Sequence, residues 1–296
     1  MMTRLSISAF RHWASWTCMA AVVLALAACQ KSDEFVYTDE DTSEGTSVDV
    51  VVADDEGNKT SLPSGTAMGI YVTDTEGGVT CQQMVVDGNG QIVIPLTTGY
   101  ASVVAYCPFQ PEWGTDAMTN HPVFEVQVDQ SDDNGYKASD LMRGTMATDT
   151  RSTVGMVMKH MLVKGAVHVV DETGQVDFTR LGARLVNVNN SVLVDLEHVS
   201  VETLAENRSD VRMNVEVRTD WRMSAYAIVA PQTVQEGRTL FTVTMGGSKQ
   251  RYLVQQTTEM EGGKTYTFNV RLTDDGLIPD GNYVTDWDEE NENDLI

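Results

Sequence analysis

The residue types that could support metal binding are few and widely spaced in this sequence. Beyond residue 28 the histidines are His121, His160, His168 and His198. His160 and His168 would share a face only if one strand ran unbroken between them, and Lys164-Gly165 argues against that, so strand histidines are favoured over a zinc pair. The acidic run 286–294 lacks the D-x-D-x-D-G spacing of a calcium loop. We expect no metal and no protein-bound cofactor.

Carboxylates are the other group that could do chemistry. The chain has 43 Asp and Glu against 20 Lys and Arg. With so many acids, any two could be paired as a general acid and a general base, so their mere presence is a weak signal. No G-x-S-x-G elbow, H-E-x-x-H motif, phosphate-binding glycine loop or C-x-x-C pair occurs. We expect a protein that is not an enzyme. A carboxylate-dependent hydrolase is a remote alternative, which would need an acidic cleft with raised carboxyl pKa values.

Among the residues that could react chemically, Cys29 has the neighbouring sequence that most clearly indicates a function. Residues 1–28 carry Arg4 and Arg11 but no acid, and their apolar run is about ten residues long. That run is shorter than the roughly 20 residues of a spanning helix and is typical of a secretory signal. Leu26-Ala27-Ala28-Cys29 resembles the bacterial lipobox. We therefore expect cleavage between Ala28 and Cys29 and acylation of Cys29, which would anchor the protein to the outer membrane.

Strong negative charge limits the partners of the mature chain. Loss of residues 1–28 leaves 18 basic and 43 acidic residues, a net charge of −25. This charge disfavours nucleic acid and anionic membrane surfaces, which are bound through Lys and Arg. Ten acids and no Lys or Arg occur between Asp33 and Glu56, so we expect residues 29–46 to be an acidic disordered tether. Lys31-Ser32-Asp33-Glu34 resembles the signal that directs Bacteroidales-type lipoproteins to the cell surface.

Alternation of apolar and polar residues with period 2 recurs along the rest of the chain. Three clear examples are 124–128, 241–245 and 266–272. This period is typical of strands with one buried and one solvated face. Turn sequences such as Asp87-Gly88-Asn89-Gly90 separate the strands. A helical turn or two is conceivable only at 139–148. The pattern predicts an all-β chain in which sandwiches are the expected architecture.

Polar residues gather between two halves that are rich in strands. The segment 129–153 contains many Asp, Ser, Thr and Gly residues, so we expect it to be a loop at the midpoint. The predicted organisation is a signal peptide at 1–28, a tether at 29–46, an N-terminal sandwich at 47–152 and a C-terminal sandwich with an acidic tail at 153–296. Cys81 and Cys107 could pair, although buried thiols are the more frequent outcome.

Several stretches resemble the fimbrillin-like family of fimbrial subunits from Bacteroidales-type bacteria. They are "ASVVAYCPF" followed by Tyr136-Lys137-Ala138-Ser139-Asp140-Leu141-Met142, then "VGMVMKHMLVKGAVHV", then "AYAIVAPQTVQEGRTLFTVTMGG", "GGKTYTFNVRL" and "VTDWDE". They follow the order in which the family has its motifs and extend over most of residues 100–288. The resemblance implies two tandem transthyretin-like β-sandwiches and a role in building or anchoring adhesive fimbriae at the cell surface.

The resemblance also implies a mode of assembly. Stalk subunits of the family lose their first strand to an Arg- or Lys-specific protease, and a strand from the neighbouring subunit's C-terminal segment fills the groove. The expendable strand here would be Ser47–Ala53 with Val48, Val50 and Val52 on one face, and the cut would fall at Lys59. The candidate donor is 279–296, although its acids fit an apolar groove poorly. An anchor would need no cut and would keep its lipid. The implied partners are other fimbrial subunits and a host or bacterial surface receptor.

A stand-alone glycan-binding surface lipoprotein is the alternative from another functional class. Such a protein would present exposed aromatic side chains to sugar rings. Trp113, in "PFQPEWGTD", and Trp221 are the candidates, and either could equally be a core residue.

Overall fold

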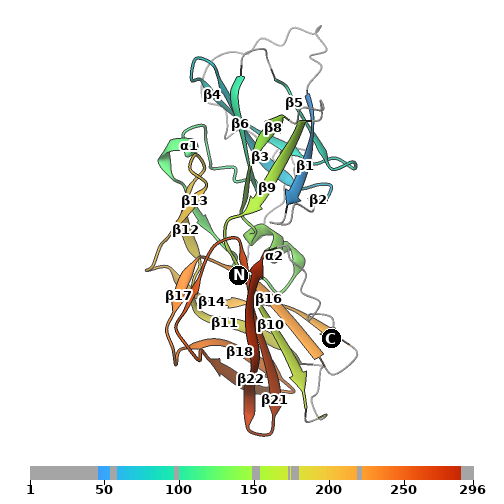
Figure 1. Ribbon diagram of the computed structural model, residues 1–296, viewed down its shortest axis with the longest axis vertical. Coiled ribbons are helices and arrows are strands. Elements are labelled where there is room, and N and C mark those ends of the chain that lie inside the picture. The colour runs from blue at the N-terminus through green and yellow to red at the C-terminus, as the bar shows by residue number, and fades with distance from the viewer. Residues whose placement is uncertain are drawn as a thin grey trace, which may run out of the picture.

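The protein is elongated and built almost entirely of strands. The computed structural model describes residues 46–53, 59–96, 100–148, 154–172, 174, 180–218 and 222–287. Most blue-to-green strands form one end of the molecule and most yellow-to-red strands the other (Figure 1). Described helices are limited to α1 (Ala117–Asn120) and α2 (Asp133–Ser139), and neither is long and apolar enough to cross a membrane. The predicted all-β class is confirmed.

One sheet contains most strands of the N-terminal half. Its strands are β1 (Thr46–Ala53), β2 (Lys59–Ser61), β3 (Ala67–Asp74), β4 (Val79–Val85), β5 (Gln91–Ile94), β6 (Tyr100–Cys107), β8 (Met142–Thr148) and β9 (Val154–His160). Their order is β2-β1-β9-β8-β6-β3-β4, with β5 paired to β1. The β4–β5 turn forms as its sequence predicts, because Asp87 Oδ1 accepts hydrogen bonds from the main-chain N–H groups of Asn89 and Gln91 at 2.8 and 2.9 Å.

The segment expected to be a midpoint loop contains regular structure. Residues 129–153 hold α2 and β8, and the helical turn considered for 139–148 is a strand from Met142 onward. β9, which follows the expected boundary at 152, pairs with β8 and β1. The N-terminal sheet therefore extends to His160. The polar residues of 132–140 form α2 and its two caps, and the Asp132 carboxylate caps the start of the helix by accepting from Gly135 N–H.

The C-terminal half is a sandwich of two sheets. One sheet has the order β15-β16-β10-β21-β22, and the other has the order β14-β11-β18-β19. Their bounds are β10 (Val163–Asp171), β11 (Gly182–Asn189), β14 (Arg208–Arg212), β15 (Asn214–Arg218), β16 (Arg222–Val229), β18 (Thr239–Met245), β19 (Ser248–Leu253), β21 (Lys264–Thr273) and β22 (Gly276–Asp286). The core between them includes Phe241, Tyr252 and Phe268, whose rings pack at 4.6 to 5.9 Å between centroids. This burial of apolar faces is what the period-2 pattern of β18 and β21 predicted.

The two ends are joined by a waist with its own small sheets and core. β7 (Val123–Glu125) pairs with β12 (Ser191–Asp195), and β12 pairs with β13 (Ser200–Thr203). β17 (Gln232–Val234) pairs with β20 (Thr258–Met260). The waist core takes side chains from both halves of the chain, among them Tyr106, Trp113, Leu141, Leu162, Val194, Ile228 and Trp287. The halves are therefore packed against each other and not merely linked.

Buried polar groups reinforce the waist. The fully buried amide of Gln130 accepts from Ile228 N–H and donates to Ile228 C=O, both at 2.8 Å. Arg143 of β8 donates from Nε to Leu196 C=O at 2.9 Å. Burial lowers the pKa of Arg143, and the nearby Asp195 partly offsets this effect. Each bond satisfies a main-chain group that would be costly to leave unpaired inside the protein.

Candidate functional site

β1 is held along both of its edges. One edge pairs in parallel with β9, from Asp49 opposite Gly155 to Val52 opposite Met158. The other edge pairs antiparallel with β5 over Thr46–Asp49 and with β2 over Val51–Ala53. β1 is thus an inner strand of its sheet, although it is the first strand that the structure describes. Few residues connect it to β2, so one backbone cut there would break the covalent link between β1 and the strands that follow it.

Side chains of β1 alternate between core and surface. Val48 and Val50 are 0% exposed, and Val52 is partly buried on the same face. On the opposite face, Asp49 accepts a hydrogen bond from Gln91 Nε2 at 2.6 Å, and Ser47 Oγ donates to Gln91 Oε1 at 2.9 Å. The alternation arises because successive Cβ atoms of a strand point to opposite faces.

Val48 and Val50 pack into the hydrophobic core of the N-terminal half. It is lined by aliphatic side chains and methionines of the neighbouring strands, namely Leu62, Met68, Ile70, Val86, Ile92, Ile94, Met156 and Met158. Methionine is flexible and fills irregular spaces, so such a wall can adapt to different inserted side chains. Complete burial of a valine stabilises a fold by about 1.5 kcal/mol or more. β1 therefore contributes substantially to this core.

Lys59 is the first residue of β2 and lies opposite Ala53 of β1. It is exposed, as are its neighbours Thr60 and Ser61. A protease that cleaves after arginine or lysine could therefore approach Lys59 at the β1–β2 connection. Ala28 and Cys29, the expected signal cleavage and lipidation site, lie outside the described residues, so their role stays a prediction.

The aromatic residues expected to contact sugars have no supporting geometry. Trp113 is 2% exposed, with its ring centroid 4.7 Å from that of Tyr106 and 6.4 Å from that of Phe124. The waist core encloses the indole, so Trp113 is a core residue, one of the two possibilities that the sequence left open, and does not face solvent as a sugar contact would require. Trp221 lies outside the described residues. Cys81 and Cys107 are both in the thiol form and do not form a disulfide with each other.

The end of β22 is fixed to the N-terminal sheet. Trp287 stacks on His160, the last residue of β9, with 4.3 Å between ring centroids and 10° between ring planes. His160 Nδ1 lies 2.6 Å from Asp140 Oδ1, whereas His168 lies on β10 and contacts Ser224 Oγ at 2.9 Å. The two histidines therefore lie on different strands and contact different partners, so they do not form a metal pair. Residues 279–287 of the expected donor segment are held within their own subunit in this state.

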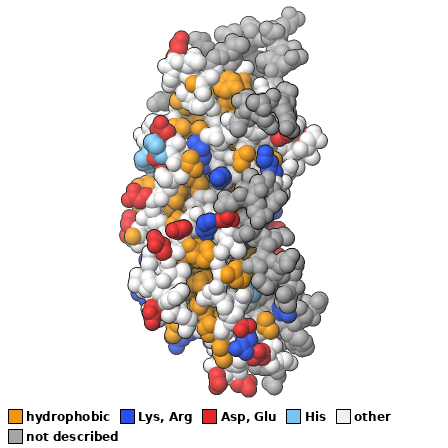
Figure 2. All heavy atoms as spheres, viewed as in Figure 1, with side chains coloured by type: hydrophobic (Ala, Val, Ile, Leu, Met, Phe, Trp, Pro, Cys, Tyr) orange, Lys and Arg blue, Asp and Glu red, His pale blue; other side chains and the backbone are white. Residues whose placement is uncertain are grey.

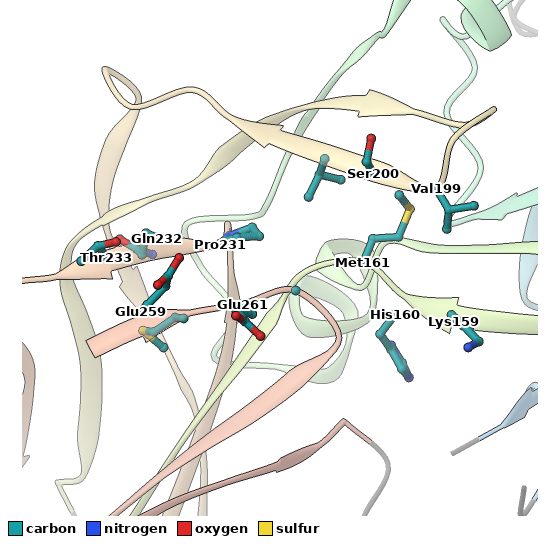
Figure 3. Close-up of a pocket in the computed structure, with 13 residues that line it drawn as sticks. Lys159, His160, Met161, Val199, Ser200, Pro231, Gln232, Thr233, Glu259 and Glu261 are labelled. Carbon is teal, nitrogen blue, oxygen red and sulfur yellow. The ribbon is translucent and has the colours of Figure 1, made fainter. Parts of the chain in front are cut away.

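A cleft of about 530 Å³ opens at the waist (Figure 3). In this view its lining falls into two groups. Gln232, Thr233, Glu259 and Glu261 lie on the left, and Val199, Ser200, Lys159 and His160 lie on the right. Gly262 closes the wall, since a Cβ there would lie 2.3 Å from Met161 C=O. Charges of both signs surround the space.

Three carboxyl groups of the described chain have a pKa shifted in the same direction. The pKa values of Asp87, Asp129 and Asp195 are lowered, chiefly by hydrogen bonds that their carboxylates accept from nearby main-chain or hydroxyl groups. A general acid would need a raised pKa. None of these three carboxyl groups therefore has the raised pKa that the hydrolase alternative would need.

The sheets and cores described above define a β-sandwich protein. Residues 36–287 match the fimbrillin-like family, and the chain belongs to that family. No curated protein matches the sequence.

Two solved structures share the fold at low sequence identity, and a third matches with a lower TM-score. A candidate cell adhesion protein from Bacteroides uniformis is 15% identical with a TM-score of 0.58, and the match covers 84% of this chain and 100% of that one. A candidate cell adhesion protein from Bacteroides ovatus is 14% identical with a TM-score of 0.61, covering 82% and 96%. The tip fimbrial protein Mfa3 from Porphyromonas gingivalis is 12% identical with a TM-score of 0.48, covering 82% and 100%.

Sequence reasoning found β1 but not the contacts that fix the other end of the chain. Trp287 belongs to the "VTDWDE" stretch that resembles the family, yet nothing in that stretch indicates its partner. His160 lies more than a hundred positions earlier. The one available signal of a buried contact was a tryptophan that follows an otherwise polar strand, because tryptophan side chains are mostly buried in folded proteins.

Proposed function

We propose that this chain is a non-enzymatic fimbrial subunit that assembles by exchanging β1 for a strand of a neighbouring subunit. The observation that carries the proposal is the position of β1, which is an inner strand with Val48 and Val50 fully buried and yet is joined to the fold through one short connection. Membership of the fimbrillin-like family agrees with this function.

Loss of β1 would leave a groove with unpaired main-chain groups along its edges and an uncovered apolar wall. The main-chain groups of β9 on one side, and of β5 and β2 on the other, would lose their partners. The apolar wall that Val48 and Val50 cover would meet water. A donor strand with alternating apolar residues satisfies both the hydrogen bonds and the pockets. Exchange of strands therefore gives a stable, directional contact between subunits.

The donor would come from the C-terminal segment of a neighbour. β22 is an edge strand paired only with β21 in its sheet, and most of its residues are exposed. Hydrophobic side chains also run along the middle of the face in Figure 2, over the β21–β22 hairpin. Residues up to Trp287 are occupied within this subunit, so donation requires release of Trp287 from His160. The acidic residues after Trp287 would remain at the surface of the groove.

Export as a lipoprotein completes the proposal. Cys29, acylated after cleavage behind Ala28, would hold the newly exported chain at the outer membrane surface. Cleavage after Lys59 would then remove the lipid and β1 together. A chain that escapes this cut would keep both and act as an anchor. Adhesion to a host or bacterial receptor would be a property of the assembled fimbria.

Strand replacement can be tested with the purified chain from Gln30 onward. After digestion with a lysine-specific protease, a fluorescent peptide with the β1 sequence TSVDVVVA should be taken up by the cut protein. Uncut protein carrying Lys59→Gln should take up none, and a peptide with Asp at the positions of Val48 and Val50 should fail to bind. Equal uptake by cut and uncut protein would contradict the proposal. Circular dichroism of the cut protein before peptide addition checks that the fold persists.

A further inference from the structure

A cavity of about 250 Å³ lies in the C-terminal sandwich, apart from β1 and its core. It is bordered by β11, the start of β14, β17 and the turn between β17 and β18, which lie together in the lower half of Figure 1. The volume is slightly below the roughly 300–1,000 Å³ that encloses a drug-sized ligand. It suits a single compact group, such as one sugar residue.

An irregularity in β11 shapes this cavity. Leu185 pairs with Val211 and Val188 pairs with Ser209, so Val186 and Asn187 together oppose the single residue Asp210. Asn187 has φ 51°, a left-handed conformation that few residues other than glycine adopt, and its N–H donates to Asp210 Oδ1 at 2.9 Å. Bulges of this kind redirect groups beside functional sites. Here the bulge turns the Asn187 carbonyl toward Arg208.

Arg208 is held in place by neutral acceptors. Its Nε and one terminal nitrogen donate to Asn187 C=O at 3.0 and 2.8 Å, and its other terminal nitrogen donates to Asn189 Oδ1 at 2.7 Å. Asn189 is itself buried and bonded to Leu204 C=O and to the amide of Gln232. A guanidinium has five N–H donors, so these three bonds leave two available. These bonds fix the orientation of the Arg208 guanidinium, and no carboxylate of the described residues pairs with it.

Arg238 supplies a second guanidinium to the same cavity. It lies in the β17–β18 turn after Gly237, is exposed, and makes no side-chain bond to any described residue. Although the chain has 43 acids, no Asp or Glu is among the residues that line this cavity. Asp210 and Glu236 lie nearby in the chain but do not line it. Two cations without a lining carboxylate are an unusual local environment in so acidic a protein.

The remaining lining combines hydroxyl and apolar groups. Thr233 and Thr239 contribute hydroxyls that make no side-chain hydrogen bond within the described part of the chain. Val234 and Leu240, which are buried, form apolar walls between them. A sugar ring offers hydroxyl groups around an apolar ring face, and a guanidinium recognises a carboxylate through paired N–H donors.

We propose that this cavity binds a sugar acid, with the carboxylate held by Arg208 and Arg238 and the ring hydroxyls by Thr233 and Thr239. The ligand class follows from the two guanidinium groups, the hydroxyls and the size of the space. The site would let the C-terminal sandwich contact acidic glycans whether or not β1 is exchanged. Its test is therefore independent of strand replacement.

The proposal can be tested on the purified chain from Gln30 onward by amide NMR titration with glucuronic acid, its methyl ester and N-acetylneuraminic acid. We expect saturable shifts from at least one of the two acids, centred on Asn187, Val188 and Arg238, and none from the ester. Arg238→Gln should weaken binding at least about tenfold, the effect of losing a charged hydrogen bond. Arg251→Gln removes the same charge from exposed β19 outside the cavity and should leave affinity within about twofold.

Three results would overturn the assignment. Equal binding of the acid and its ester would remove the role of the carboxylate. Equal losses of affinity in Arg238→Gln and Arg251→Gln would show that binding depends only on the overall charge of the protein. Inorganic sulfate that binds as tightly as either sugar acid would exclude recognition of the sugar. The Arg238 side chain makes no hydrogen bond to a described residue, so its variant should fold normally, and the spectrum of the free protein verifies this.

Discussion

The indole of Trp287 lies flat on the imidazole of His160, with 4.3 Å between the ring centroids. The contact joins the residue that follows β22 to the residue that ends β9, and His160 is held in turn by Asp140 at 2.6 Å. Lys264 and Asp286 form an ion pair beside it. The C-terminal strand of one sandwich is thereby fastened to the sheet that contains β1. Exchange of the two terminal strands in a fimbria would act on directly connected parts of the molecule.

Replacement of Trp287 by alanine should loosen this connection. Trp287 is 7% exposed, and loss of a buried tryptophan costs about 3–5 kcal/mol. We expect a clear fall in the free energy of unfolding and faster amide exchange along Thr285 and Asp286. Val284→Ala, at a position that is 54% exposed, should change stability by less than about 0.5 kcal/mol. Similar losses in the two variants, measured by urea unfolding, would disprove the fastening role.

The contribution of β1 to stability can be measured with a matched pair of valines. Val50→Ala removes two buried carbon atoms and should lower the free energy of unfolding by about 2 kcal/mol. Val93→Ala makes the same chemical change in β5 at a side chain that is 59% exposed, so it should have little effect. Urea midpoints at constant m-value decide the comparison. A Val50→Ala loss no greater than that of Val93→Ala would show that β1 is not an integral strand.

The two thiols should differ in reactivity. Burial raises the pKa of the Cys107 thiol, and the negative charge of Asp140 adds to this effect. Cys81 is only half-buried, on the edge strand β4. Since the thiolate is the reactive form, native protein from Gln30 onward should label at Cys81 and not at Cys107, and both should label after unfolding. Failure of both to label in unfolded, unreduced protein would instead reveal a disulfide.

Asp195 should make stability depend on pH in the acid range. Its pKa is lowered, first by the hydrogen bond from His198 N–H and further by the His198 and His121 side chains. A carboxyl group with a lowered folded pKa stabilises the fold above its unfolded pKa of about 3.9, and this stabilisation is lost as pH falls through the folded value. Asp195→Asn should therefore be less stable than the parent at pH 7, with a difference that shrinks below about pH 4.

Glu197→Gln is the matched control for this prediction, because it removes one charge from the same turn. Its effect on the free energy of unfolding should be small. Urea unfolding across a pH series gives both curves. A gap between Asp195→Asn and the parent that stays constant down to the lowest pH would contradict the assignment to Asp195 ionisation.

Much of the fold was predictable because many strands bury one face. β1, β18 and β21 alternate regularly, and each lies within a residue or two of its predicted position. β8 was missed because Arg143 and Gly144 interrupt its pattern. The structure explains both residues: Arg143 bonds to Leu196, and a Cβ on Gly144 would lie 2.5 Å from Val157 C=O. The local strand propensity of a segment does not depend on the contacts that distant parts of the fold make with it, so it cannot predict them.

The functional geometry was less accessible to sequence reasoning. Val48 and Val50 could be proposed as a buried face from alternation alone. Their parallel pairing with β9, about a hundred residues later, could not, because such pairing depends on the order of the whole sheet. The cavity with Arg208 and Arg238 depends on a bulge in which two residues oppose one. No pattern in β11 distinguishes that bulge from a regular strand.

Mass spectrometry of the native N-terminus tests the exchange of β1 most directly. Protein from sheared surface filaments should begin at Thr60 and yield no peptide from residues 46–59, while protein retained in the outer membrane should begin at acylated Cys29. Filament protein that still contains residues 46–53 would contradict the account, since its groove would be filled by its own strand.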